Sequence, residues 1–132
     1  MKTKVKIITS PNSEAQHQAN VINWALLHRE EYPELEMLHH IPNGGRRDPI
    51  EAKHLKEQGV KAGVPDLCLP VPRGGYHGLY IEMKTEHGHT SEAQERWGEK
   101  LTAQGYRWQV CHGWEAAVST LEWYLTLPED RP

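Results

Sequence analysis

Two short apolar runs joined by a Pro/Gly-rich turn are the feature that most constrains how this chain can fold. Residues 63–84 have the sequence GVPDLCLPVPRGGYHGLYIEMK, with apolar runs at Leu67–Leu69 and Leu79–Ile81. Between the runs lie prolines and glycines, which favour turns. The second run contains β-formers, including Tyr80, and its flanks mark it as a buried strand. The pattern predicts a hairpin of two strands.

Charged side chains gather at the ends of these predicted strands. Asp66 precedes the first run, and the second run ends in Glu82-Met83-Lys84. Residues two apart on a strand share a face, so Glu82 and Lys84 point the same way, and the hairpin would bring Asp66 near them. The structural alternative is a surface salt bridge of little energetic value. A charged pair ending a buried strand, however, needs partners or a metal, and carboxylate oxygens suit a hard cation such as Mg²⁺.

The spacing of these residues resembles the signature of the PD-(D/E)XK nucleases. Pro65-Asp66 is followed, after fifteen residues, by Glu82-Met83-Lys84. With Gly63-Val64 before it and Glu14-Ala15-Gln16 upstream, the set resembles the VRR-NUC domain (virus-type replication–repair nuclease) in its short, stand-alone, phage-like form. The resemblance covers roughly residues 13 to 115. It implies an α/β fold with a restriction-endonuclease-like αβββαβ core, in which helices flank a mixed central sheet.

The resemblance also implies a metal site. Asp66 and Glu82 would be direct ligands of Mg²⁺ or Mn²⁺, and the backbone carbonyl of Met83 would add a third oxygen. Lys84 would lie near the attacking water, either as a base or as a charge stabiliser, and the sequence leaves both roles open. Glu14 would reach the same cluster from the first helix, through a second metal or a water.

Two of the expected catalytic residues have structural alternatives. Glu14 lies in the first turn of a predicted helix, where an acid interacts favourably with the helix dipole. Gln94 begins another predicted helix and matches a polar position of this nuclease branch. It would orient Lys84 or the phosphate, and the alternative is an ordinary residue of a helix start.

The charge balance does not identify a DNA-binding protein by itself. The net charge is −3, which differs from the strongly basic balance of proteins that coat nucleic acid. An acidic metal cluster lowers the net charge without removing a local basic patch. Taken singly, each cation could instead be an ordinary residue on a solvent-exposed face. As a group we expect phosphate contacts from Arg46, Arg47, Lys53, Lys61, Arg73 and His89.

Hydrophobic periodicity predicts four helices and four strands in a small α/β domain. The first helix would begin after Ser13, run to about Glu31 and carry Leu27 on its apolar stripe. The helix between the first two strands departs from the bare nuclease core. The predicted helices are at about 13–31, 49–58, 91–103 and 114–125, and the strands are at 35–41, 67–69, 79–84 and 106–111.

Length and composition predict one domain, 1–132, with a core at about 13–125. No apolar run is long enough to span a membrane, and the N-terminus lacks the length of a signal peptide. We therefore expect an intracellular, cytoplasmic protein, and the resemblance implies a phage or prophage protein in a bacterial host. Cys68 and Cys111 are expected to be buried thiols, and their spacing does not favour zinc.

The first functional hypothesis is a metal-dependent DNA endonuclease. It would hydrolyse phosphodiester bonds, with selectivity for branched DNA such as Holliday-junction-like structures, in phage replication, recombination or repair. The family resemblance implies a homodimer. The alternative is a non-catalytic nucleic-acid-binding module with a degenerate nuclease site. A third possibility is an interaction protein in which these residues form ordinary salt bridges.

Overall fold

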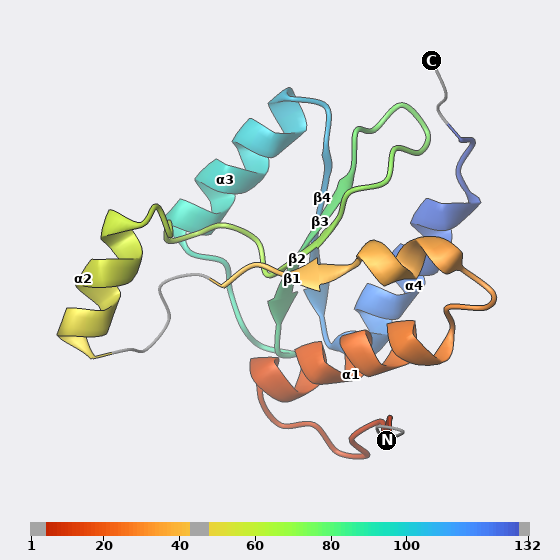
Figure 1. Ribbon diagram of the computed structural model, residues 1–132, viewed down its shortest axis with the longest axis horizontal. Helices are drawn as coiled ribbons and strands as arrows, with labels where there is room; N and C mark the ends of the chain where they lie inside the picture. The colour runs from red at the N-terminus through yellow and green to blue at the C-terminus, as the bar shows by residue number, and fades with distance from the viewer. Residues whose placement is uncertain (1–4, 43–47, 130–132) are drawn as a thin grey trace.

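A four-stranded mixed sheet organises the chain in the computed structural model, which describes residues 5–42 and 48–129 (Figure 1). The strands follow the order β1 (His39–His40), β2 (Leu67–Leu69), β3 (Leu79–Lys84) and β4 (Arg107–His112). The first three pair in antiparallel fashion, and β3 and β4 run parallel. The predicted α/β class, with helices flanking a mixed sheet, is confirmed.

The predicted hairpin forms between β2 and β3. Leu67 pairs with Ile81, and Leu69 pairs with Leu79. Alternation along β3 places Leu79, Ile81 and Met83 in the hydrophobic core. The remaining residues of β3, including Glu82 and Lys84, therefore share the opposite face.

Helices α1 (Glu14–Leu27) and α4 (Trp114–Thr126) supply much of the rest of the core and lie side by side in Figure 1. On α4, the side chains of Ala117, Leu121 and Tyr124 are fully buried. The Tyr124 hydroxyl also donates a 2.7 Å hydrogen bond to the Val71 carbonyl in the hairpin connection. Each large apolar side chain buried here contributes roughly 1.5–3 kcal/mol.

Helix α1 begins as predicted but ends earlier. Ser13 caps it by accepting a hydrogen bond from the Gln16 N–H. The helix stops at Leu27, where the His28 N–H bonds to the Ala25 carbonyl and tightens the last turn. Leu27 is 55% exposed, so its expected place on the apolar stripe was wrong.

The strand expected at residues 35–41 was also wrong over most of its length. The chain forms a 3-10 helix, η1, at Pro33–Met37, and β1 contains only His39 and His40. Pro33 at the first helical position and acids in the first turn favour a helix start. Leu35 is the residue of η1 that is buried. One buried apolar side chain therefore attaches this segment to the core, without the alternating pattern of a strand.

Helix α3 (Glu92–Ala103) packs closely on β4 through a glycine. A Cβ atom at Gly98 would lie 2.3 Å from the Trp108 ring, so only glycine allows this approach. Ser91 and Gln94 form a capping box that fixes the start of α3. The start of α3 is also tied to β3, because Gln94 donates a hydrogen bond to Glu82.

Helix α2 (Pro49–Glu57) stands apart from the rest of the fold in Figure 1. Asp48 caps it by accepting hydrogen bonds from the backbone N–H groups of Ile50 and Glu51. The helix buries none of its residues. Within residues 5–42 and 48–129, no helix has the length and apolar character needed to cross a membrane.

Candidate active site

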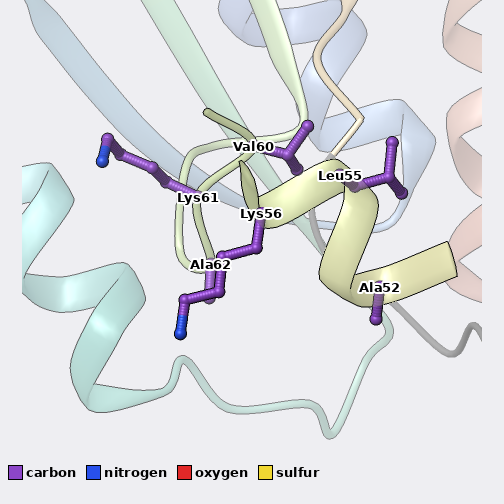
Figure 2. Close-up of a pocket in the computed structure, with 6 residues that line it drawn as sticks. All are labelled: Ala52, Leu55, Lys56, Val60, Lys61 and Ala62. Atoms are coloured by element: carbon purple, nitrogen blue, oxygen red, sulfur yellow. The ribbon is translucent and has the colours of Figure 1, made fainter. Parts of the chain in front are cut away.

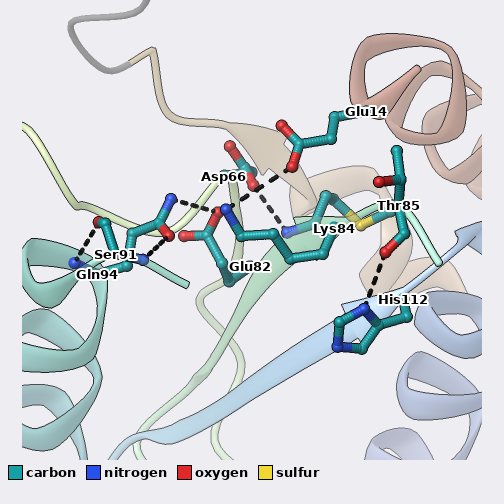
Figure 3. Close-up of polar contacts among 9 residues, drawn as sticks. Glu14, Asp66, Glu82, Lys84, Thr85, Ser91, Gln94 and His112 are labelled. Carbon is teal, nitrogen blue, oxygen red and sulfur yellow. Dashed lines mark hydrogen bonds and ion pairs between the residues drawn. The ribbon is translucent and has the colours of Figure 1, made fainter. Parts of the chain in front are cut away.

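Asp66 is held against β3 by its carboxylate and by its backbone. Its Oδ2 accepts a 2.7 Å hydrogen bond from the Met83 N–H (Figure 3). Its carbonyl accepts hydrogen bonds from the Ile41 N–H and from Nδ1 of His40, each 2.8 Å long. Pro65 before it is fully buried. The acid is therefore fixed at the point where β2 begins.

Glu82 is a buried acid with one unsatisfied oxygen. The side chain is 2% exposed, and its Oε2 accepts a 3.2 Å hydrogen bond from Nε2 of Gln94. Its Oε1 is buried, and no donor in the described part of the chain reaches it. Burial raises the pKa of Glu82 from 4.5 to about 9. The neighbouring Asp66 carboxyl is the second cause of this rise, through its contact and its charge, whereas the Lys84 charge lowers the pKa. Two carboxyl groups are thus crowded together.

Lys84 and Glu14 meet at the same end of β3. Lys84 is 8% exposed, and its Nζ lies 3.7 Å from Oε1 of Glu14. Glu14 reaches this position from the first turn of α1. Its charge also contributes to the raised pKa of Glu82. The structure therefore brings together Glu14, Asp66, Glu82 and Lys84, as the sequence predicts.

Gln94 contacts Glu82, whereas the expected target was Lys84 or the phosphate. Its Oε1 accepts a 2.8 Å hydrogen bond from the Ser91 N–H, while its Nε2 donates to Glu82. Both ends of one amide are used, one for the capping box and one for the acid. The start of α3 consequently orients the Glu82 carboxylate (Figure 3).

The oxygen-rich donors at this site fit a hard divalent cation. Asp66, Glu82 and the Met83 carbonyl could hold it, and the unsatisfied Oε1 of Glu82 is the observation that favours this fit. In the described ranges, no three His, Cys, Asp or Glu side chains form a ready-made metal cage. Mg²⁺ commonly binds through one or two carboxylates, completed by water and substrate phosphates. The donor set here is of that kind.

Two histidines that the sequence did not assign to the nuclease site lie beside it. His112 ends β4 and is the register partner of Lys84, and its Nδ1 donates a 2.9 Å hydrogen bond to the Thr85 carbonyl. Nδ1 of His17 accepts a 3.0 Å hydrogen bond from the Trp114 N–H. Both rings line a cavity of about 480 Å³. A histidine ending the strand parallel to the Glu-x-Lys strand is the signal that could have identified His112.

The expected phosphate contacts that the structure describes lie in different environments. Arg73 is 7% exposed, and its guanidinium binds the Glu34 carboxylate at 2.7 Å, which gives it a role in the fold. Lys53, Lys61 and His89 are exposed, and their contacts with DNA stay predictions. Arg46 and Arg47 lie outside the described residues.

Cys68 and Cys111 are buried free thiols, as predicted. Burial raises the pKa of both thiols. Cys68 pairs with Tyr80 in the register of β2 and β3, and Sγ of Cys111 lies 3.5 Å from the Thr120 hydroxyl. Both cysteines therefore belong to the packing of the sheet.

The half-buried Asp66 and the buried Glu82 and Lys84 lie together at one end of the mixed sheet of an α/β domain. The profile of the VRR-NUC domain family matches residues 2–115. A solved structure described as a VRR_NUC domain protein has 33% sequence identity and a TM-score of 0.77, and the match covers 91% of this chain and 93% of that chain. No curated protein matches the sequence.

The chain belongs to the VRR-NUC family, and the resemblance expected from the motifs is confirmed. Family membership implies a nuclease-like domain that binds DNA.

Proposed function

We propose that this chain is an Mg²⁺- or Mn²⁺-dependent endonuclease that hydrolyses phosphodiester bonds in DNA. The observation that carries the proposal is the pair of Asp66 and Glu82. Glu82 is buried, and no donor from the described residues reaches its Oε1. Its pKa is raised to about 9 by burial first and by Asp66 second. A structural salt bridge would leave neither the orphaned oxygen nor the crowded acid pair.

Each residue of the cluster has a role in this proposal. Asp66, Glu82 and the Met83 carbonyl would hold the ion, which when bound supplies an activated water and neutralises phosphate charge. Lys84 places an ammonium group at the same end of β3. It either takes the proton of the attacking water or stabilises the charge that develops on the phosphate. Glu14 positions that ammonium through their ion pair.

We further propose that the substrate is branched DNA and that the enzyme acts as a homodimer in phage replication, recombination or repair. Exposed apolar side chains on adjacent helices support the dimer, because such groups favour burial against a partner. They are Leu26 and Leu27 on α1 and Trp123 on α4, which are 38%, 55% and 42% exposed. Light scattering on the wild type and on Trp123→Glu tests this part. A monomeric wild type contradicts it.

Cleavage of labelled DNA tests the central proposal. Four-way junction, flap, duplex and single-stranded substrates are incubated with Mg²⁺, Mn²⁺ or EDTA. We expect metal-dependent cutting by the wild type, with a loss of at least about a hundredfold in Asp66→Ala, Glu82→Ala and Lys84→Ala. Glu30→Ala removes an exposed acid after α1 and is the matched control.

The outcomes of this assay separate the hypotheses. Full activity in a folded Asp66→Ala protein would overturn the assigned site. Tight DNA binding without cutting, unaffected by metal, would favour the degenerate binding module. The ranking of the four substrates decides whether the enzyme prefers branched DNA.

A further inference from the structure

A groove runs between α2 and α3, beside the candidate active site. It consists of two adjoining cavities of about 460 and 330 Å³, which share Lys61 and Ala62. We call their union the basic groove. The first cavity is lined by Ala52, Leu55, Lys56, Val60, Lys61 and Ala62 (Figure 2). The second is lined by Lys61, Ala62, Ala93, Arg96, Trp97 and Lys100.

Positive charge is concentrated in the basic groove. Four cations line it, and no acid does, although the whole chain has a net charge of −3. In the described part of the chain, none of the four forms an ion pair. The four cations are Lys56, Lys61, Arg96 and Lys100.

Helix α3 separates its charges by face. Arg96 and Lys100 are four residues apart, so they lie one above the other on the stripe that lines the groove. Of the three acids of the same helix, the second and third fall on a different stripe at 3.6 residues per turn, and the first lies one turn before Arg96 without lining the groove. These acids are Glu92, Glu95 and Glu99, and all of them are exposed. The groove face of α3 is therefore basic, whereas the helix as a whole is not.

The residues that line the basic groove are connected along the chain to the acid cluster. Gly63, next to Ala62, has φ +90° and packs so closely on α3 that a Cβ atom would lie 2.7 Å from the Ala93 carbonyl carbon. Ala93 is followed by Gln94, which holds Glu82. On the opposite wall, the chain passes from Gly63 to Asp66 within three residues. Each wall of the groove is thus close along the chain to a residue of the acid cluster or to its contact Gln94.

We propose that the basic groove holds the sugar–phosphate backbone of a duplex DNA arm that extends from the cleavage point. The inference rests on the proposed nuclease function and assigns it a substrate-binding surface. Unpaired lysine and arginine side chains attract a phosphate chain and release its counterions. Lys56 and Lys61 extend toward the side of α3 in Figure 2, whereas Leu55 and Val60 point the other way. Such contacts position DNA without reading its sequence.

Fluorescence anisotropy with a labelled duplex tests the groove. Binding is measured in EDTA, so that no cutting occurs, over a series of salt concentrations. We expect Arg96→Gln/Lys100→Gln and Lys56→Gln/Lys61→Gln each to weaken binding on the order of tenfold and to reduce the salt slope by about two. Arg96→Lys/Lys100→Arg keeps the charges and is expected to bind as the wild type does. Thermal melting verifies that each variant is folded.

A matched control removes the same charge elsewhere. Lys6→Gln/Arg29→Gln changes two exposed cations outside the groove, on the N-terminal arm and after α1. We expect its duplex affinity and salt slope to equal those of the wild type. A loss of affinity as large as that in the groove variants would overturn the proposal, because net charge alone would then control binding.

Kinetics with metal distinguish the groove from the catalytic cluster. The groove variants are expected to raise KM for DNA and to leave kcat at saturating DNA unchanged, since they remove uniform binding. If the wild type cuts DNA and these variants match it in both constants and in affinity, the groove proposal fails while the nuclease stands. If the wild type binds through the groove but cuts nothing, the nuclease fails while the groove stands. Loss of self-association without loss of DNA affinity would make the groove a protein interface and overturn the proposal.

Discussion

The backbone N–H of Met83 donates a 2.7 Å hydrogen bond to the Asp66 carboxylate, which ties the start of β2 to the end of β3. Asp66 therefore has two functions in the site. One of its oxygens orders the strand that carries Glu82 and Lys84, and in the proposed function its charge would hold a cation. These two functions can be separated by substitution.

Asp66→Asn is expected to be more stable than Asp66→Ala, although both are inactive. Both variants remove the repulsion with Glu82, but only asparagine keeps an oxygen that can accept from the Met83 N–H. Met83 is 1% exposed, and an unsatisfied buried N–H costs about 1–3 kcal/mol. Chemical denaturation in EDTA measures the difference. Equal free energies of unfolding would show that the hydrogen bond does not order the strand.

The metal-free protein should lose stability as the pH rises from about 4.5 to about 9. Because folding raises the pKa of Glu82, the folded state retains a proton that the unfolded state releases in this range. The contribution of Glu82 to the free energy of unfolding is fully present below its pKa in the unfolded state. It decreases as the pH rises to its pKa in the folded state, by at most about 1.4 kcal/mol per pH unit. The glutamine side chain of Glu82→Gln does not titrate. The stability of this variant relative to the wild type should therefore increase with pH in thermal melts in EDTA. A constant difference across the range would contradict the raised pKa.

Metal affinity should rise with pH over the same interval and level off near the folded pKa of Glu82, about 9. The cation must displace the proton that Glu82 retains, so each ion bound releases protons. Isothermal titration with Mn²⁺ in buffers of different ionisation enthalpy measures that release. Glu82→Gln and Asp66→Asn should show little or no binding. Undiminished Mn²⁺ binding in both variants would place the metal elsewhere.

Gln94→Ala should reduce activity by about 10- to 100-fold without abolishing it, as is typical when a residue that orients a metal ligand is removed. Ser91→Ala is the matched control. It removes the side-chain cap of α3, worth about 1 kcal/mol, but keeps the Gln94 amide next to Glu82. Steady-state kinetics and melting curves of both variants separate positioning from helix stability. Equal activity losses in the two would assign Gln94 to the cap alone.

Gly63→Ala should destabilise the protein more than Gly59→Ala. Both glycines have positive φ angles, +90° and +98°, so each alanine carries a backbone cost of roughly 1 kcal/mol. Only at Gly63 would the new Cβ also meet α3, 2.7 Å from the Ala93 backbone, whereas nothing lies within 4 Å at Gly59. Thermal melts rank the two variants. Similar losses of stability would show that the loop before Asp66 can move away from α3.

The acid cluster was predictable because its geometry follows from short-range rules. Strand alternation places Glu82 and Lys84 on one face, and the turn between the apolar runs returns the chain to Asp66. The start of α1 could be placed by the Ser13 cap, which locates Glu14 in the first turn. These signals lie within a few residues of the groups that they position.

Other features depend on contacts that a single sequence does not encode locally. The ion pair of Arg73 with Glu34 joins residues 39 positions apart, so Arg73 resembled a free cation in the turn. The apolar residues from Leu35 onward have the pattern of a strand. In the structure only Leu35 of η1 is buried, and burial of one residue is compatible with a helical turn. The groove residues Arg96 and Lys100 were missed because their importance arises only when α2 faces α3.

Helix α2 contributes no side chain to the interior. Its sequence can therefore be rewritten without repacking the sheet, provided that the Asp48 cap and the path to Gly63 are kept. Under the groove proposal, α2 is therefore a replaceable part of the DNA-binding surface beside the candidate active site. Exchange of residues 50–57 for a helix of different surface charge would be a direct way to engineer which nucleic acids the domain accepts.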